Sequence, residues 1–232
     1  MGTDPTDLRR QRIFKKLAEK LQRLTREPVA YDPSHLDDSV AMQTDWTPAK
    51  AGGASFRTHR LVEANASRME FRASAGAIAF YLLFLLSGLV VIIGFSAANL
   101  SSGGFSFSGA TALPLFVGVV FATLGGCMLY FGAAPIVFDK RSDAFWKGRT
   151  APYEAVNRAA LKHFTELDEI HALQLISEFC RSDKSSYYSY ELNLVLKDAR
   201  RINVVDHGNQ EQLREDARTL SAFLEAPVWD AT

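Results

Sequence analysis

The chain contains one long uncharged stretch, ASAGAIAFYLLFLLSGLVVIIGFSAANLSSGGFSFSGATALPLFVGVVFATLGGCMLYFGAAPIVF, which runs for 66 residues from Ala73 to Phe138. Arg72 precedes it and Asp139 follows it, and no Asp, Glu, Lys, Arg or His lies between them. All 26 Lys and Arg and all 26 Asp and Glu residues therefore lie elsewhere, and the formal net charge of zero conceals an apolar insert. This distribution excludes a freely soluble single domain, a disordered chain and a strongly basic nucleic-acid-binding protein.

The uncharged stretch divides into two predicted transmembrane helices, at 74–98 and 113–137, joined by a Ser/Gly-rich loop at 99–112. The first has 25 residues, and the second spans from Leu113 to at least Phe131, so each can cross a hydrocarbon core of about 30 Å. Basic residues flank both ends of the pair: Arg57, Arg60, Arg68 and Arg72 before it, and Lys140, Arg141, Lys147 and Arg149 after it. The positive-inside rule then predicts a multi-pass membrane protein with cytoplasmic termini and an extracytoplasmic loop. We expect the membrane to be the bacterial inner (plasma) membrane.

Small residues recur at four-residue spacing in the second span, at Gly118, Ala122 and Gly126. Such a stripe lets helix backbones approach closely, either between the two spans of one chain or between two copies of it. The spans carry no ionisable side chain, which argues against a proton relay or an ion site within the membrane.

Residues 1–30 are predicted to form a basic amphipathic helix, and residues 31–54 a linker rich in Pro, Gly, Asp and Ser. The helix either lies on an anionic leaflet or packs its leucine stripe on protein. Its candidate lipid-contacting residues are Arg9, Arg10, Arg12, Lys16, Lys20 and Arg23.

The remaining residues predict an α+β cytoplasmic domain. A β-hairpin is expected at 55–72, then about five strands after the membrane, of which 188–197 shows the clearest alternation, and a final helix capped by Asn209 and stopped by Pro227. Seven strands and a C-terminal helix match a pleckstrin-homology-like (PH-like) barrel over 135–230 together with 55–72, with the transmembrane hairpin inserted between its second and third strands. Alternatively the 55–72 hairpin is separate and precedes a five-stranded sheet covered by the helix.

Four segments resemble the two-span photosystem I assembly factors of chloroplasts and cyanobacteria, and bacterial membrane proteins of similar layout that are uncharacterised. They are Val137–Lys140, Leu167–Ile170, Ile202–Asp206, and the closing run from Leu213 to Ala217 and from Phe223 to Val228. The resemblance covers 74–230 and implies a non-enzymatic, membrane-anchored assembly or scaffolding protein with a PH-like domain.

No catalytic, metal or cofactor site is predicted. Asp206 and His207 near Ser189 lack the G-x-S-x-G turn of a hydrolase, and His171 beside Glu169 lacks further ligands at metal-binding spacing. The candidate binding surface is instead Arg181, Lys184 and Tyr187, because aromatic residues and Arg are enriched in interfaces.

We therefore expect a membrane-anchored binding or scaffolding protein that assists the assembly or regulation of a membrane complex. Its expected partners are the lipid bilayer, a membrane protein and a second copy of the chain, with no nucleic acid. The alternatives are a module that recognises anionic lipid at the membrane surface, and an accessory subunit of a transporter.

Overall fold

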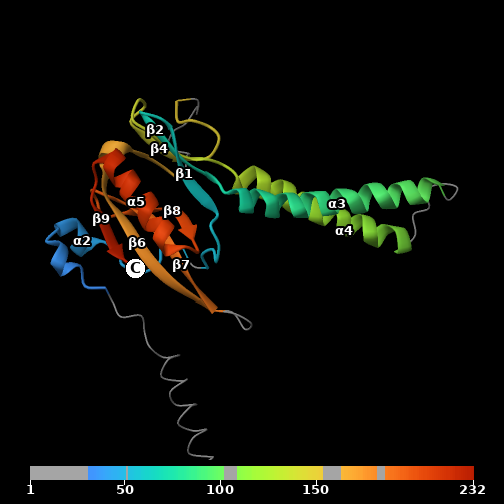
Figure 1. The fold of residues 1–232 in the computed structure, drawn as a ribbon, viewed down its shortest axis with the longest axis horizontal. Coiled ribbons are helices and arrows are strands. Elements are labelled where there is room, and N and C mark those ends of the chain that lie inside the picture. The colour runs from blue at the N-terminus through green and yellow to red at the C-terminus, as the bar shows by residue number, and fades with distance from the viewer. Residues whose placement is uncertain (1–30, 51, 102–108, 154–162, 182–185) are drawn as a thin grey trace, which may run out of the picture.

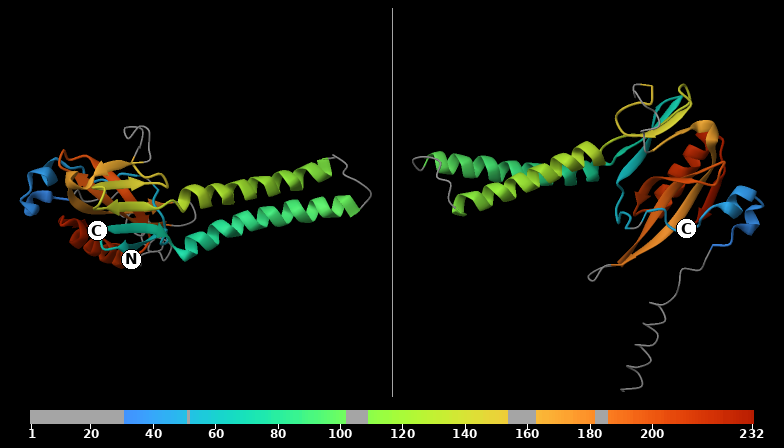
Figure 2. Two further views of the ribbon diagram at one scale, coloured as in Figure 1. Left: turned by 90° about the horizontal axis from the view of Figure 1, so that it is seen from above. Right: turned by 180° about the vertical axis from the view of Figure 1, so that it is seen from behind.

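A computed structural model describes residues 31–50, 52–101, 109–153, 163–181 and 186–232. It shows an α+β domain of two sheets, from which a hairpin of two long helices projects (Figures 1 and 2). The predicted basic helix at 1–30, with its six candidate lipid contacts, and most of the loop between the spans lie outside the described residues.

The first sheet has five antiparallel strands in chain order: β1 (His59–Asn65), β2 (Arg68–Ala73), β3 (Ile136–Asp139), β4 (Ala144–Lys147) and β5 (Phe164–Glu166). The second sheet has the order β8 (Arg201–His207), β7 (Ser186–Leu196), β6 (Ile170–Arg181) and β9 (Val228–Ala231), with β9 parallel to β6. The predicted 55–72 hairpin is thus confirmed, and it belongs to the same sheet as the strands that follow the helices.

The helical hairpin is inserted between two paired strands. Helix α3 (Ala75–Ser101) follows β2, and α4 (Gly109–Cys127) continues as a π-helical turn, η2 (Met128–Gly132), before β3. Strands β2 and β3 pair directly, with Arg68 opposite Asp139 and Phe71 opposite Ile136. The two helices thus lie between the second and third strands, as predicted, and these two strands are neighbours in one sheet.

The second helix ends at Gly132, earlier than the predicted bound of Val137. Pro135 disfavours helical geometry at Ala134, and Ile136 to Asp139 are instead drawn into the sheet by their pairing with β2. The last five residues of the predicted second span therefore belong to the turn and to β3.

Close packing between α3 and α4 uses two of the three predicted small residues. Gly118 and Ala122 face Gly88 of α3, where an added Cβ at Gly88 would lie 2.8 Å from the Ala122 Cα. Gly125, which the predicted stripe omits, lies equally close to the backbone of Leu85. By contrast, a Cβ at Gly126 would meet nothing within 4 Å, so this member of the stripe points away from α3.

Helix α5 (Gln210–Leu224) closes the core that the two sheets share. It begins where predicted, because the Asn209 side chain accepts a hydrogen bond from the Gln212 N–H at 3.1 Å. Its buried residues Leu213, Ala217 and Leu220 join one apolar cluster with Phe71 and Phe138 of the first sheet and with side chains of β6 and β7. Figure 1 shows the helix lying across the second sheet.

Neither sheet closes into a barrel in the described part of the chain, so the predicted barrel geometry is not observed. At one junction the sheets meet through a single bridge, between Arg57 and His207. At the other, the outer edge of β6 is occupied by β9, which was not predicted, so β5 has no free edge to pair with.

The linker prediction for residues 31–54 is wrong, because much of this segment packs on the second sheet. It forms a short 3₁₀ helix, η1 (Pro33–Leu36), and α2 (Ser39–Gln43), which is capped by Asp38. The buried Ala41 and the partly buried Trp46 contact Ala172, Val195 and Trp229 of the sheet. Apolar residues too widely spaced to show a period are therefore enough to hold the segment in place.

Candidate ligand site at the foot of the helical hairpin

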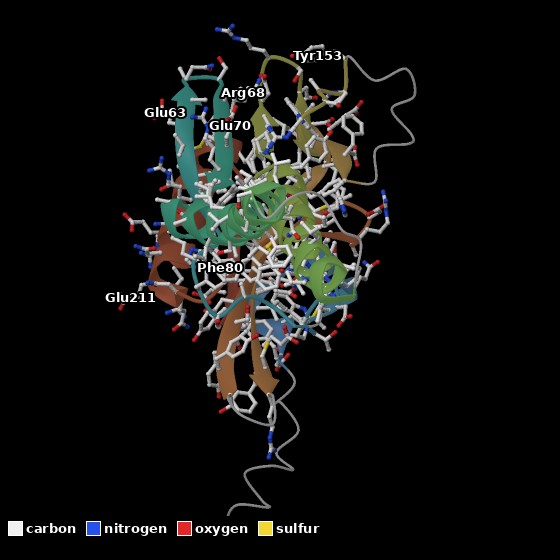
Figure 3. The ribbon with its side chains drawn as sticks, turned by 90° about the vertical axis from the view of Figure 1, so that its right-hand side faces the viewer. Glu63, Arg68, Glu70, Phe80, Tyr153 and Glu211 are labelled. Atoms are coloured by element: carbon white, nitrogen blue, oxygen red, sulfur yellow. The ribbon has the colours of Figure 1, made fainter. Side chains whose placement is uncertain are left out.

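A cavity of about 370 Å³ lies where the helical hairpin meets the two sheets. The helices contribute Tyr81, Phe131 and Gly132 to its wall, and Lys147 and Gly148 contribute from the end of β4. Figure 3 looks along the hairpin onto the sheets and shows Phe80 close to the hairpin axis, whereas Glu63, Arg68 and Glu70 lie toward one end of the domain. The remaining lining residues are Lys50, Gly52, Ala54, Thr58, His59, Ala134, Ile136, Asn203, Val204, Val205 and Asp206.

The start of α3 is fixed to the wall of this cavity by Ser74. Its N–H donates to the Thr58 carbonyl at 2.8 Å and its hydroxyl donates to the Arg57 carbonyl at 2.7 Å. The same hydroxyl accepts the Ala77 N–H at 3.0 Å, as an N-cap does. Thr58 in turn donates its hydroxyl to the Asp206 carbonyl at 3.0 Å, which connects the helix to β8.

Lys147 is the most unusual charged residue of the cavity. Its pKa is lowered to about 8: burial is the main cause, the Asp206 carboxylate opposes the shift, and the positive charge of Lys50 contributes to it. Within the described residues its ammonium has neither an ion pair nor a hydrogen-bond partner. An unpaired and partly desolvated cation is costly for a fold unless a bound anion compensates it.

A second cavity, of about 720 Å³, continues from the first and shares Lys50, Lys147 and Asn203 with it. Its other described lining residues are Ala49, His163, Phe164, Arg200, Arg201 and Ile202, none of which is a carboxylate. Arg201 is held in place, because it donates to the Thr47 carbonyl at 2.6 Å and to the Asp45 carboxylate at 3.1 Å. The two cavities, which we call the foot cleft, together have a cationic wall, and among the described residues that line them Asp206 is the only carboxylate.

The outer wall of the foot cleft is a strap, residues 45–50 and 52–54, that crosses the second sheet. The fully buried Glu191 accepts the backbone N–H groups of Ala49 and Lys50 at 2.8 and 2.9 Å. Glu178 accepts those of Gly52 and Gly53 at 3.0 and 3.2 Å. These paired bonds place the Lys50 ammonium 3.6 Å from the Asp206 carboxylate.

Two histidines with lowered pKa values lie beside the cleft. Burial lowers the pKa of His59 to about 4, and the positive charge of Lys147 acts in the same direction. Burial also lowers the pKa of His207 to about 4, and Arg57 adds to the shift. His207 is fully buried, its Nδ1 accepts the Asn209 N–H, and its Nε2 has no partner. Both rings are therefore neutral at pH 7.

The predicted surface of Arg181, Lys184 and Tyr187 is only partly described, because Lys184 lies outside the described residues. Arg181 is exposed, whereas Tyr187 is half-buried and donates its hydroxyl to the Gly53 carbonyl at 2.9 Å, so it holds the strap. The exposed aromatic side chains at this end of the β6–β7 pair are Phe179 and Tyr188, each 55% exposed.

His171 and His207, which were considered from the sequence as site residues, each have a hydrogen-bond partner in the fold. His171 Nε2 is 2.7 Å from the Asp38 carboxylate, and no group of three or more His, Cys, Asp or Glu in the described ranges is placed to hold a metal. The sequence did not reveal that Lys50 and Asp206 lie near Lys147. In the sequence, Lys147 served only as one of the basic residues that predict which side of the membrane holds the termini. The one available signal was a lysine at the end of a strand whose other residues are apolar.

Comparison of the chain with protein-family models, with curated proteins and with solved structures finds no match in any of the three.

Proposed function

We propose that the α3–α4 hairpin spans a membrane and that the two-sheet domain is a non-enzymatic binding module held against the membrane surface, where it assists the assembly or regulation of a membrane complex. The observation that carries the proposal is the insertion of the hairpin between β2 and β3. Because both helices continue directly from paired strands, the domain has a fixed distance from the bilayer.

Exposure of the helices supports the proposed span. Both are long and apolar enough to cross a membrane, and only 11% of the most apolar window of each is buried. The core helix of a soluble protein would be covered by protein, whereas side chains such as Leu83, Val90 and Ile93 are more than 60% exposed. Such a surface is stable in lipid and prone to aggregate in water.

Residues at the ends of the helices support the orientation of the hairpin in the membrane, with the two-sheet domain on the cytoplasmic side. Arg149 donates to the Tyr130 and Leu129 carbonyls, which are freed near the end of α4 and η2, and its guanidinium lies over the Tyr130 ring. Arg at the negative end of a helix, beside an interfacial Tyr, is typical of a cytoplasmic boundary. In this orientation the two-sheet domain lies on the cytoplasmic side of a bacterial inner membrane.

Topology can be tested with single cysteines in a chain whose Cys127 and Cys180 are replaced. A cysteine at Gly104 should react with an impermeant maleimide from outside intact cells, and one at Lys197, on the β7–β8 turn, only after lysis. Labelling of both positions from the same side would contradict the span.

Partner binding can be tested by crosslinking in intact membranes, followed by purification in mild detergent. We expect the full chain to copurify with a membrane protein in fixed proportion, and an Arg181→Ala, Tyr188→Ala variant reports whether the exposed end of β6–β7 takes part. A chain that is monomeric and alone in every preparation would contradict the scaffolding role.

Recognition of anionic lipid is a second candidate function, favoured by the cationic wall of the foot cleft at the level where the helices leave the sheets. A role as accessory subunit of a transporter has no such support, since the spans carry no Asp, Glu, Lys, Arg or His.

A further inference from the structure

We propose that the foot cleft binds the phosphate of an anionic headgroup, with Lys147 and Lys50 as its two charged contacts. The inference deepens the candidate function of lipid recognition and rests on the proposed membrane span only for the source of the phosphate. A phospholipid headgroup and a soluble phosphate ester share the chemistry that the cleft recognises.

The charges that line the foot cleft favour an anion. Lys50, Lys147, Arg200 and Arg201 line the two cavities, and Asp206 is the carboxylate among the described lining residues. Three of the four cations have an ion pair: Lys50 with Asp206 at 3.6 Å, Arg200 with Asp198 at 2.5 Å and Arg201 with Asp45 at 3.1 Å. Within the described residues this leaves the charge of Lys147 uncompensated, and a cavity with unbalanced charge of one sign attracts ligands of the opposite sign.

The environment of Lys147 also favours an anion. Its ammonium is largely removed from water but has no partner among the described residues. A lysine serving only to pack the sheet would extend its charge into solvent. A phosphate satisfies it, because several oxygens can accept from Lys147 and Lys50 together.

The position and size of the cleft suit a lipid headgroup. Tyr81 and Phe131, from the ends of the two helices, line the same cavity as Lys50 and Lys147, so aromatic and cationic side chains meet in it. Volumes of about 370 and 720 Å³ suit a headgroup and are too small for a folded partner. In a bilayer the acyl chains would leave the cavity along α3 and η2.

The test uses the full-length chain in a neutral detergent, with binding measured by native mass spectrometry and by ligand-induced shifts of the thermal midpoint. The probes are phosphatidic acid, phosphatidylglycerol and phosphatidylcholine, and, without acyl chains, glycerol 3-phosphate and inorganic phosphate. We expect phosphatidic acid and phosphatidylglycerol to bind more tightly than phosphatidylcholine, with an affinity that falls as salt is raised.

Lys147→Gln should weaken binding about tenfold or more, the loss typical for a hydrogen bond to a charged group. Lys147→Arg should restore most of the affinity. Lys140→Gln is the matched control: it removes the same charge from the β3–β4 turn, where Lys140 lies 3.8 Å from Glu225 and over the Phe223 ring, away from the cleft. This control should change affinity less than about twofold.

The source of the phosphate follows from the probes. If glycerol 3-phosphate or inorganic phosphate binds as tightly as the lipids and is weakened by Lys147→Gln, the cleft is a phosphate site with a soluble ligand. If only the lipids bind, the ligand is a headgroup. Equal affinities of wild type, Lys147→Gln and Lys140→Gln for every probe would overturn the site. Since this assay contains no bilayer, that result would leave the topology test, and with it the proposed span, unaffected.

Discussion

Replacing Gly125 with alanine should loosen the helical hairpin, whereas the same change at the adjacent Gly126 should not. A Cβ at Gly125 would overlap the backbone nitrogen of Leu85 and lie 2.6 Å from its Cα. At Gly126 the added Cβ would meet nothing within 4 Å. The two variants have the same composition and differ only in which face of α4 carries the new methyl group.

The size of the effect follows from two opposing contributions. Alanine favours helix over glycine by about 1 kcal/mol, and this gain applies equally at both positions. At Gly125 the helices must separate by at least roughly 0.8 Å, which brings the contact with Leu85 Cα from 2.6 Å to 3.4 Å, the lower bound of ordinary contact, and the nearer Leu85 nitrogen requires more; overpacking of this kind costs about 1–3 kcal/mol. We expect Gly125→Ala to be less stable than Gly126→Ala by about 1–3 kcal/mol.

Stability of the hairpin can be measured by titrating SDS into mixed micelles and following helix content by far-UV circular dichroism. Gly88→Ala and Gly94→Ala form a second pair on α3, since Gly88 faces Ala122 and a Cβ at Gly94 would meet nothing within 4 Å. Equal unfolding midpoints within both pairs would refute the packing of α3 on α4.

Three further predictions concern the sheet domain and can be checked by urea unfolding in detergent, followed by tryptophan fluorescence. Glu191→Ala should lower the free energy of unfolding by about 2–4 kcal/mol, because it leaves two strap N–H groups without a charged acceptor. Glu178 is more exposed, so Glu178→Ala should lower it by less than about 1 kcal/mol. Similar losses for the two variants would contradict the anchoring role of Glu191. His59 and His207 both have a pKa of about 4 in the folded protein. Each should therefore contribute on the order of 3 kcal/mol to a loss of stability as the pH decreases from about 6.5 to 4, and His207→Phe should remove about half of this loss. The charged form of Lys147 is disfavoured in the fold, so without ligand Lys147→Met should be more stable than the wild type below pH 8, by about 1–3 kcal/mol. This difference should disappear as the pH approaches about 10.5, where the lysine is neutral in both states. A difference that stays constant with pH would exclude titration of Lys147 as its cause.

Sequence patterns predicted the helices and strands that are determined by their own residues. The absence of charge from 73 to 138 marked the helical hairpin, the alternation in 188–197 marked β7, and Asn209 marked the start of α5. In each case the residues that produce the pattern also bury or cap the element. The second sheet could be predicted only in part, because β9 is short and pairs with β6 across more than 50 residues.

The strap and the foot cleft could not be predicted, because they depend on distant contacts of main-chain groups. Ala49 donates its N–H to Glu191, 142 residues away, and such a bond leaves no pattern in the donor segment. Lys147 and Asp206 likewise come together only when the two sheets meet. The segment 31–54 therefore had the composition of a linker although its backbone is held by two carboxylates.

The position of the helical hairpin between β2 and β3 explains why the candidate ligand site lies at the base of the helices. The start of α3 is bonded through Ser74 to Thr58, and Thr58 is bonded to the Asp206 carbonyl of β8, on the opposite wall of the cleft. His59 and Gly132, the last residue of η2, both line the cavity, and the backbone of Gly132 acts to raise the pKa of His59. Both helix ends thus lie against residues that shape the cavity, so a change in helix tilt must move its walls. By the reciprocity of linked equilibria, a ligand that prefers one width of the cleft must also prefer one tilt of the hairpin.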